Sequence, residues 1–366
     1  MQDDKTINGI MYLVACFIDC CILLIYYLRN VQYNNIICNM KNRIFQIDLI
    51  RGFVIFLMTI DHIVHCNPFI KILADPIDIT NSSKILIILR LIGHLCPPTF
   101  ILLCGISVYI KQQNKSNDIS NSIMKRGLFL ILMEFTIVTF GWTLAINPYK
   151  IFLQVIFVIG MSLIALGIMI RYFNRWTILY ISCSLILLDN LITFLNISKP
   201  SNEFLQIIWA VFHEKTVFWL FDNSIFIRTT YPVLSWIGVI GIGYFLGDIY
   251  YKNDINKIKK LTITSACILL TGFLTRYYIN FGEKSEYIKY GDILDNILSF
   301  LNFTKYPPSL IFLTTFCSIA ILLLNFAFRF QLRNKFFEFL GRNSMKYYVT
   351  HIYVITIFYK IIQHLN

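Results

Sequence analysis

Four ionisable residues lie inside one apolar stretch of the chain, residues 44–64 (IFQIDLIRGFVIFLMTIDHIV). Asp48 and Arg51 are three residues apart, one helical turn, and so share a helix face. His62 follows Arg51 by eleven residues, which returns it to nearly the same face about 16 Å further along the axis. Arginine binds phosphate and histidine moves protons near neutral pH. This face therefore suits a reaction with a charged donor at one end and an acceptor that loses a proton at the other.

Each of these residues also has a structural interpretation. Asp48 and Arg51 form an ion pair that could equally well lock a helix end, and a single buried histidine such as His62 is more often a hydrogen-bonded core residue. Asp61 is placed to orient His62, and His65 lies just beyond it. We predict His62, Asp61 and His65 as catalytic residues, with both histidines open as the general base.

Other apolar runs also contain charged residues. The run RLIGHLCPPTFILLCGISVYI holds Arg90 and His94, and Pro97–Pro98 should break the helix there. Broken helices at membrane depth are tolerated where they line a cavity. Glu134 lies in the middle of the following run, where its structural role would be to pair with an arginine. A charge inside a bilayer is costly unless it is paired or solvated, which makes such residues site candidates. The predicted substrate-binding residues are Arg51, Asp48, Arg90, His94, Glu134 and Arg276.

The composition is that of a membrane protein. Of the 366 residues, 57% are hydrophobic and 14% charged, whereas soluble domains carry about 25% charged residues. We predict an all-α, polytopic bundle of about ten transmembrane helices and an interfacial or re-entrant segment at 204–221. The predicted spans are 10–28, 44–64, 87–110, 127–146, 151–171, 176–197, 231–250, 261–281, 308–328 and 345–364.

The net charge of +12 comes from lysines and arginines between the apolar runs. They form no basic stripe interleaved with aromatic residues, so we expect the lipid bilayer and not nucleic acid as a partner. Placing the start of the 44–64 span in the cytoplasm puts every short basic loop inside and both termini outside. The ten cysteines show no metal-binding spacing, and we predict no metal site and no tightly bound cofactor.

These segments resemble a known family. RIFQIDLIRGFVIFLMTIDHI, RLIGHLCPPTFILLCGISVYI, SFLNFTKYPPSL and LGRNSMKYYVTHIYVI are similar, in order, to the bacterial form of the heparan-alpha-glucosaminide N-acetyltransferase catalytic domain family, over about residues 42–360. This implies a transmembrane acyltransferase-like domain at 41–366, preceded by an extra N-terminal helix and a cytoplasmic link at 1–40. It also implies a multi-pass protein of the bacterial inner membrane.

The resemblance further implies transfer of an acetyl or acyl group from cytoplasmic acetyl-CoA or another acyl-CoA to a hydroxyl or amine of an extracytoplasmic glycan or glycolipid. Related O-acyltransferases share an Arg, ten residues and a His, the spacing of Arg51 and His62. In them the histidine is the base and the arginine lies on the donor side. Arg51, Lys125 and Arg126 would then bind the phosphates of coenzyme A.

The sequence departs from the animal member of the family and leaves one alternative open. In the animal lysosomal enzyme, the position of His62 resembles an asparagine and the catalytic histidine lies further on, where this chain reads FIKILADP (69–76). The same buried charges also fit a transporter or permease of a small anion or a lipid-linked sugar. A dimer is one oligomeric state that the sequence allows.

Overall fold

The computed structural model describes residues 43–65, 77, 79, 82–114, 118–145, 149–220, 225–279, 283 and 285–365. The predicted span at 10–28, the link that follows it and the FIKILADP stretch lie outside these residues. The described chain is mostly helical.

Nine of the ten predicted spans fall almost entirely within the described residues, and helices occur at all nine. The tenth, 10–28, lies outside the described residues. The helices at the nine spans are α2 (Phe45–His65), α3 (Lys84–Gly93), α4 (Cys96–Asn114), α5 (Ile119–Met133), α6 (Thr139–Thr143), α7 (Val155–Tyr172), α8 (Arg175–Phe194), α10 (Leu234–Tyr251), α11 (Ile255–Tyr278), α13 (Leu310–Arg329) and α15 (Ser344–Leu365). A π-helical turn, η3 (Glu134–Val138), joins α5 to α6. Shorter helices are α9 (Glu203–Phe212), α12 (Ile293–Leu301) and α14 (Lys335–Arg342).

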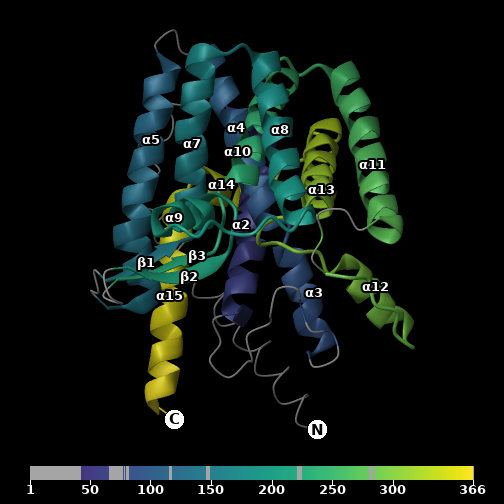
Figure 1. Cartoon of the computed structure of the whole chain (residues 1–366). Coiled ribbons are helices and arrows are strands. Elements are labelled where there is room, and N and C mark those ends of the chain that lie inside the picture. Colours follow the sequence, from purple (N-terminus) through teal and green to yellow (C-terminus); the bar gives the residue numbers. More distant parts are fainter. Residues whose placement is uncertain are drawn as a thin grey trace.

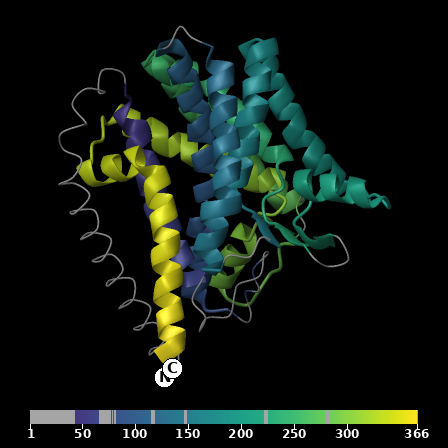
Figure 2. The same ribbon diagram turned by 90° about the vertical axis from the view of Figure 1, so that its left-hand side faces the viewer.

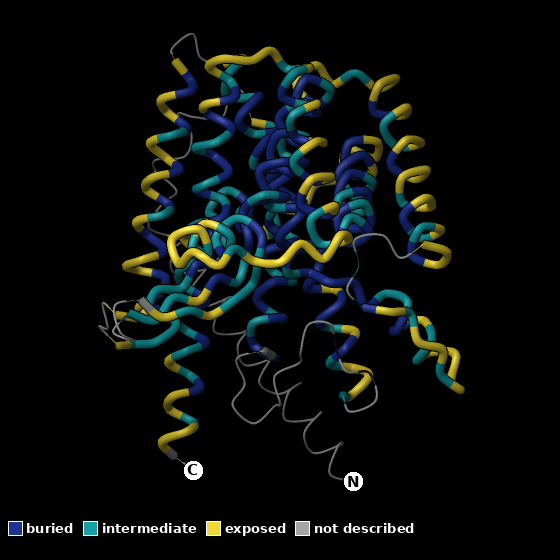
Figure 3. Tube along the Cα trace, viewed as in Figure 1, coloured by how far each residue is buried: buried dark blue, intermediate teal, exposed yellow. Residues whose placement is uncertain are grey.

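Within the described chain, six helical segments are long and apolar enough to cross a membrane: α3 together with α4, α7, α8, α10, α11 and α13. The protein is therefore an integral membrane protein. The outer faces of α5, α8 and α11 are exposed, while α4, α10 and α13 are buried in the centre (Figure 3). Exposed side chains on these outer faces include Leu128, Leu187 and Leu270. Apolar side chains pointing outward are expected where lipid takes the place of water.

The predicted break at Pro97–Pro98 coincides with the junction of α3 and α4. The α-helical assignment is interrupted at His94 and Leu95, and the two prolines occupy the first turn of α4. Proline is accommodated there because the first turn of a helix has no internal partner for its backbone N–H groups.

The all-α prediction was wrong for three short segments. Strands β1 (Lys150–Leu153), β2 (Thr216–Leu220) and β3 (Ile225–Thr229) form a sheet in the order β1-β3-β2. β1 pairs with β3 in parallel and β2 pairs with β3 in antiparallel fashion. The predicted interfacial segment at 204–221 is helix α9 followed by β2. Short apolar runs rich in β-branched and aromatic residues do not distinguish strand from helix by pattern alone.

The two ends of the bundle differ. The connections α7–α8 and α10–α11 lie at the upper end in Figure 1, whereas the sheet, α9 and α12 lie lower. Basic residues lie in these connections or in the adjoining helix ends: Arg171, Arg175, Lys252 and Lys257. Figure 2 shows α15 running from α14 down one side of the molecule. Basic connections thus gather at the end opposite the sheet.

Glycines allow several helices to pack at backbone distance. A Cβ on Gly105 of α4 would lie 2.0 Å from the carbonyl oxygen of Ile240, and one on Gly243 of α10 would lie 2.2 Å from that of Leu102. Small residues at helix crossings are the usual means of close packing in membranes. These contacts fix α4, which carries one wall of the cavity described next.

Candidate active site

An internal cavity of about 700 Å³ follows α2 through the bundle. Its α2 wall extends from Ile47 to His62, about 22 Å of helix at roughly 1.5 Å per residue. The remaining walls come from α4, α5, α7, the α14–α15 junction, Tyr231 and Lys305. Arg51 and His62 therefore both line one cavity, Arg51 toward the start of α2 and His62 toward its end.

The end of the cavity where α2 begins is cationic. Arg51 donates to Asp48 Oδ1 at 3.0 Å and to Ser107 Oγ at 2.8 Å. The cations lining this end are Arg43, Arg51, Lys111, Arg126 and Arg342, and the described carboxylate among them is Asp48. This end of the cavity therefore carries a surplus of positive charge, and guanidinium groups are well suited to binding phosphate. The structure brings Arg126 to this end but leaves Lys125 exposed and off the cavity wall.

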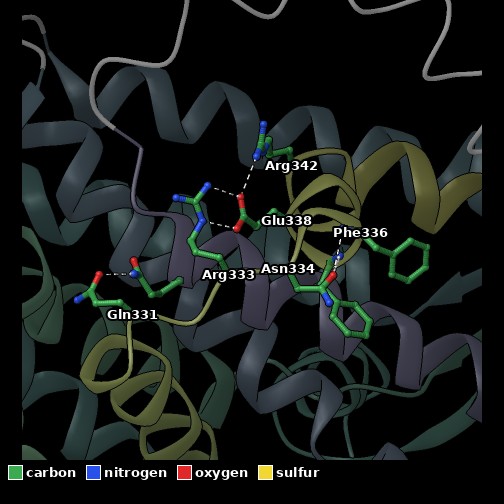
Figure 4. A network of polar contacts seen from close by, with 8 residues as sticks. Gln331, Arg333, Asn334, Phe336, Glu338 and Arg342 are labelled. Carbon is green, nitrogen blue, oxygen red and sulfur yellow. Dashed lines mark hydrogen bonds and ion pairs between the residues drawn. The ribbon is translucent and has the colours of Figure 1, made fainter.

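A buried carboxylate holds Arg342 at this cationic end of the cavity. Glu338, 1% exposed, accepts from Arg342 at 3.0 Å and from Arg333 at 2.6 and 3.2 Å (Figure 4). Arg333 lies outside the membrane-spanning helices, and its hydrogen bond to Glu338 raises its pKa above the ordinary value. Asn334 starts α14 by accepting from two backbone N–H groups, as a helix N-cap does. One carboxylate thus positions two guanidinium groups, of which Arg342 lines the cavity.

Helix α14 is pressed directly against the charged turn of α2. A Cβ on Gly341 would lie 1.8 Å from the carbonyl oxygen of Asp48, and one on Gly52 would lie 1.8 Å from that of Phe337. Only glycine fits at either position without moving a backbone. The two glycines therefore set the position of Arg342 relative to Arg51.

At the opposite end of the cavity, His62 forms a pair with His351 of α15. The two rings are stacked with centroids 5.1 Å apart, and His62 Nδ1 lies 2.9 Å from His351 Nε2. Trp142 packs edge-on against the His62 ring at 5.3 Å. His62 is partly exposed and lines the cavity, whereas His351 is 1% exposed behind it.

The hydrogen bonds define the tautomers of this pair. His351 Nδ1 lies 3.1 Å from the carbonyl oxygen of Tyr347, which only accepts, so Nδ1 carries the proton. In neutral His351, Nε2 is then the acceptor and His62 Nδ1 the donor. The lone pair of His62 is left on Nε2, which is the state that a general base requires.

Asp61 has a different partner from the one predicted. Its carboxylate binds Arg90 Nη1 at 3.1 and 3.3 Å, and both side chains are buried. Gly93 allows this approach, because a Cβ there would lie 2.7 Å from Asp61 Cγ. Asp61 lines the cavity beside His62, while His62 Nδ1 donates its hydrogen bond to His351 Nε2.

Glu134 and Arg276 lie off the cavity wall, in contacts that support the fold. Glu134 Oε2 accepts from the backbone N–H of Phe157 at 3.0 Å in the first turn of α7, and not from an arginine. Arg276 donates to the carbonyl oxygens of Phe300 and Ser285, which brings the segment before α13 against α11. The cavity that was expected to collect all the buried charged residues therefore contains only some of them.

One further predicted residue, His94, lies apart from the cavity. His94 is fully buried between the rings of Phe312 and Phe316, at 5.6 and 5.8 Å, and its ring nitrogens find no hydrogen-bond partner in the described chain. The side chain of His65 lies outside the described residues, so the choice between His62 and His65 stays a prediction.

Two residues that the sequence did not predict for the site line its His62 end. Lys305 is 2% exposed and comes from the TKYPPSL string. Tyr231 accepts a hydrogen bond from the hydroxyl of Tyr306 at 2.9 Å. The string itself was the signal for Lys305, whereas His351 is recognisable only from its distance to His62. In the described part of the chain, no cluster of His, Cys, Asp or Glu suits a metal ion.

The fold and the cavity define a polytopic membrane protein with a cationic pocket at one end and a histidine pair at the other. The family model "Heparan-alpha-glucosaminide N-acetyltransferase, catalytic" matches residues 43–281. The chain belongs to this family of transferases, which confirms the predicted family over residues 43–281 of the predicted 42–360. A comparison with curated proteins gave no match. Lys305, Arg342 and His351 lie beyond the matched residues, so their roles are argued from the structure.

Proposed function

We propose that this protein transfers an acetyl or acyl group from acyl-CoA, bound at the cationic end of the cavity, to a hydroxyl or amine bound beside His62. One observation carries the proposal. A single cavity joins the arginine- and lysine-lined start of α2 to the His62–His351 pair near its end. A donor with several phosphates and a distant reactive thioester fits that separation of functions.

The donor would bind with its phosphates among Arg51, Arg126 and Arg342. Guanidinium groups bind phosphate through paired hydrogen bonds, and their side chains here project from three different helices. The pantetheine arm would then bridge the roughly 16 Å of helix between Arg51 and His62. The apolar middle of the cavity, including Ile55, suits a chain that carries no charge.

The chemical step needs one base and one electrophile. His62 Nε2 takes the proton of the acceptor O–H or N–H as the acceptor atom bonds to the thioester carbonyl carbon. The C–S bond then breaks, the product leaves with the acyl group, and coenzyme A departs as a thiol after the imidazolium returns the proton. His351 Nε2 accepts from His62 Nδ1–H throughout, which stabilises the imidazolium.

The membrane arrangement follows from the same proposal. We place the cationic end and the basic α7–α8 and α10–α11 connections in the cytoplasm, where acyl-CoA is made and positive loops are retained. The sheet and α12 then lie outside with both termini, and α2, α5–α6, α15 and the 10–28 segment bring the spans to ten. We infer a bacterial inner membrane and an extracytoplasmic glycan or glycolipid acceptor.

Reconstituted protein tests the proposal. Labelled acetyl-CoA is supplied on the cationic side, and thiol release and labelled product are followed with glucosamine as a probe acceptor. His62→Ala is expected to lower kcat by about 10²- to 10⁴-fold, the usual effect of removing a general base. His364→Ala, an exposed histidine at the end of α15, is the matched control. Undiminished transfer by His62→Ala would remove His62 from the mechanism, and uptake of a labelled sugar without thiol release would support the permease instead.

A further inference from the structure

Lys305 presents a buried ammonium group to the cavity. The residue is 2% exposed and lines the wall at the His62 end. No ion pair to its Nζ occurs among the described residues, and its close contact is with the ring of Tyr306, 5.2 Å from the centroid. A cation removed from water is costly unless an opposite charge compensates it.

The neighbouring charges do not supply that compensation. Asp61 is the described carboxylate on this part of the wall, and it is already engaged by Arg90. Asp61, Arg90 and Lys305 together leave one net positive charge. The His62 end of the cavity therefore has an uncompensated positive charge, which an anionic group from outside the protein could neutralise.

The backbone on both sides of Lys305 is held in place by hydrogen bonds. Glu283 accepts from the backbone N–H of Thr304 and from Ser309 Oγ, each at 2.7 Å, on either side of Lys305. The hydroxyl of Tyr306 binds that of Tyr231. A donor that is fixed before the substrate arrives needs little reorganisation when negative charge develops.

We propose that Lys305 is the anion-binding group of the site and binds a negatively charged oxygen next to His62. The proposal rests on the acyl transfer proposed above. The oxygen has two chemical sources. One is the carbonyl oxygen of the thioester, which gains the π-electron pair when the acceptor attacks and returns it when the C–S bond breaks. The other is an acidic group carried by the acceptor.

A second lysine supplies a matched control. Lys215 lies 4.8 Å from the centroid of the same Tyr306 ring, but it is more exposed and does not line the cavity. Replacing either lysine with methionine removes one charge and one ring contact. Only Lys305→Met removes the charge from the cavity wall.

The experiment compares Lys305→Met, Lys305→Arg and Lys215→Met in reconstituted protein. Loss of one oxyanion donor is expected to lower kcat/KM by about 10²- to 10³-fold in Lys305→Met. Lys305→Arg should recover part of the loss, and Lys215→Met should stay near wild type. A lower kcat with both glucosamine and glucosamine 6-phosphate identifies the carbonyl oxygen. A higher KM for glucosamine 6-phosphate alone identifies an acidic group on the acceptor.

A binding measurement decides the inference even if neither probe is an acceptor. Inorganic sulfate should raise the Tm of the wild type and of Lys215→Met by more than that of Lys305→Met. Equal protection of all three proteins would overturn the proposal for Lys305. Failure of the wild type to release any thiol would instead overturn the acyl transfer, while the sulfate result would still stand.

Discussion

His62 and His351, separated by 289 positions in the sequence, share a hydrogen bond of 2.9 Å between Nδ1 and Nε2. Their rings stack with an interplanar angle of 16°. The last helix of the chain thereby supports a residue of the first described helix. The bond also decides which nitrogen of His62 is basic.

Removing the ring nitrogen of His351 that accepts from His62 should slow the reaction without abolishing substrate binding. We expect His351→Leu to lower kcat by roughly 10- to 100-fold, since a positioned proton-transfer group contributes about 10²- to 10⁴-fold in all. His351→Gln, whose amide oxygen can accept from His62 Nδ1–H, should retain more activity. Initial rates across pH measure the effect. Trp142→Phe keeps an aromatic edge on His62 and is the control, and equal loss in Leu and Gln variants would indicate a packing role only.

Arg342 and Arg333 should differ although both bind Glu338. A hydrogen bond between charged groups contributes about 1.5–3 kcal/mol, so Arg342→Gln is expected to raise KM for acetyl-CoA by roughly 10- to 100-fold. Arg333→Gln loses the same carboxylate partner but lies off the cavity wall, and its KM should change by less than about 3-fold. S-acetylpantetheine lacks the phosphates and should be used equally well by both variants. Similar KM values for acetyl-CoA in the two variants would place the phosphates elsewhere.

The glycine contact between α2 and α14 should tolerate no side chain. Gly52→Ala places a methyl group 1.8 Å from a backbone oxygen and is expected to destabilise the fold by about 1–3 kcal/mol, as overpacking does. Gly291→Ala is the control, because its Cβ would have nothing within 4 Å. Thermal unfolding in detergent compares the two. A Gly52→Ala protein as stable as Gly291→Ala would show that α14 does not seat on α2.

The Asp61–Arg90 pair should behave as a structural unit. Asp61→Leu leaves a buried guanidinium with one partner fewer, and breaking such a pair costs about 3–5 kcal/mol. Asp61→Leu/Arg90→Met removes both charges and is expected to regain most of that stability in thermal unfolding. Recovery of activity in the double variant would confine Asp61 to support. Stability without activity would return Asp61 to the catalytic set.

Part of this arrangement is predictable from local pattern. Apolar runs locate the helices, and the 3.6-residue period places Arg51 and His62 on one face, because both depend on neighbours within one helix. The His62–His351 and Asp61–Arg90 bonds join different helices, and a single sequence does not specify which helices meet. The same reason explains why Glu134 was paired with an arginine in the prediction and instead caps the start of α7.

The sheet and Lys305 show a second limit. Strands β2 and β3 are short, mostly apolar runs, and the hydrogen bonding of β3 to both β1 and β2 is what distinguishes them from helix. In the sequence, Lys305 is indistinguishable from other loop lysines. Its burial depends on contacts of the preceding loop, in which Glu283 binds the backbone of Thr304 and Arg276 binds that of Ser285. A sequence shows which residues can be charged, whereas the burial of such a residue depends on the whole fold.

The backbone contact of Gly52 and Gly341 also has a mechanical consequence. Helices that touch without intervening side chains have no flexible atoms to absorb sliding, so α2 and α14 must move as one rigid body. Arg51 and Arg342 then keep a constant separation through every turnover. Any widening of the proposed donor entrance then has to come from its other lining elements, such as α4 with Lys111 and α5 with Arg126.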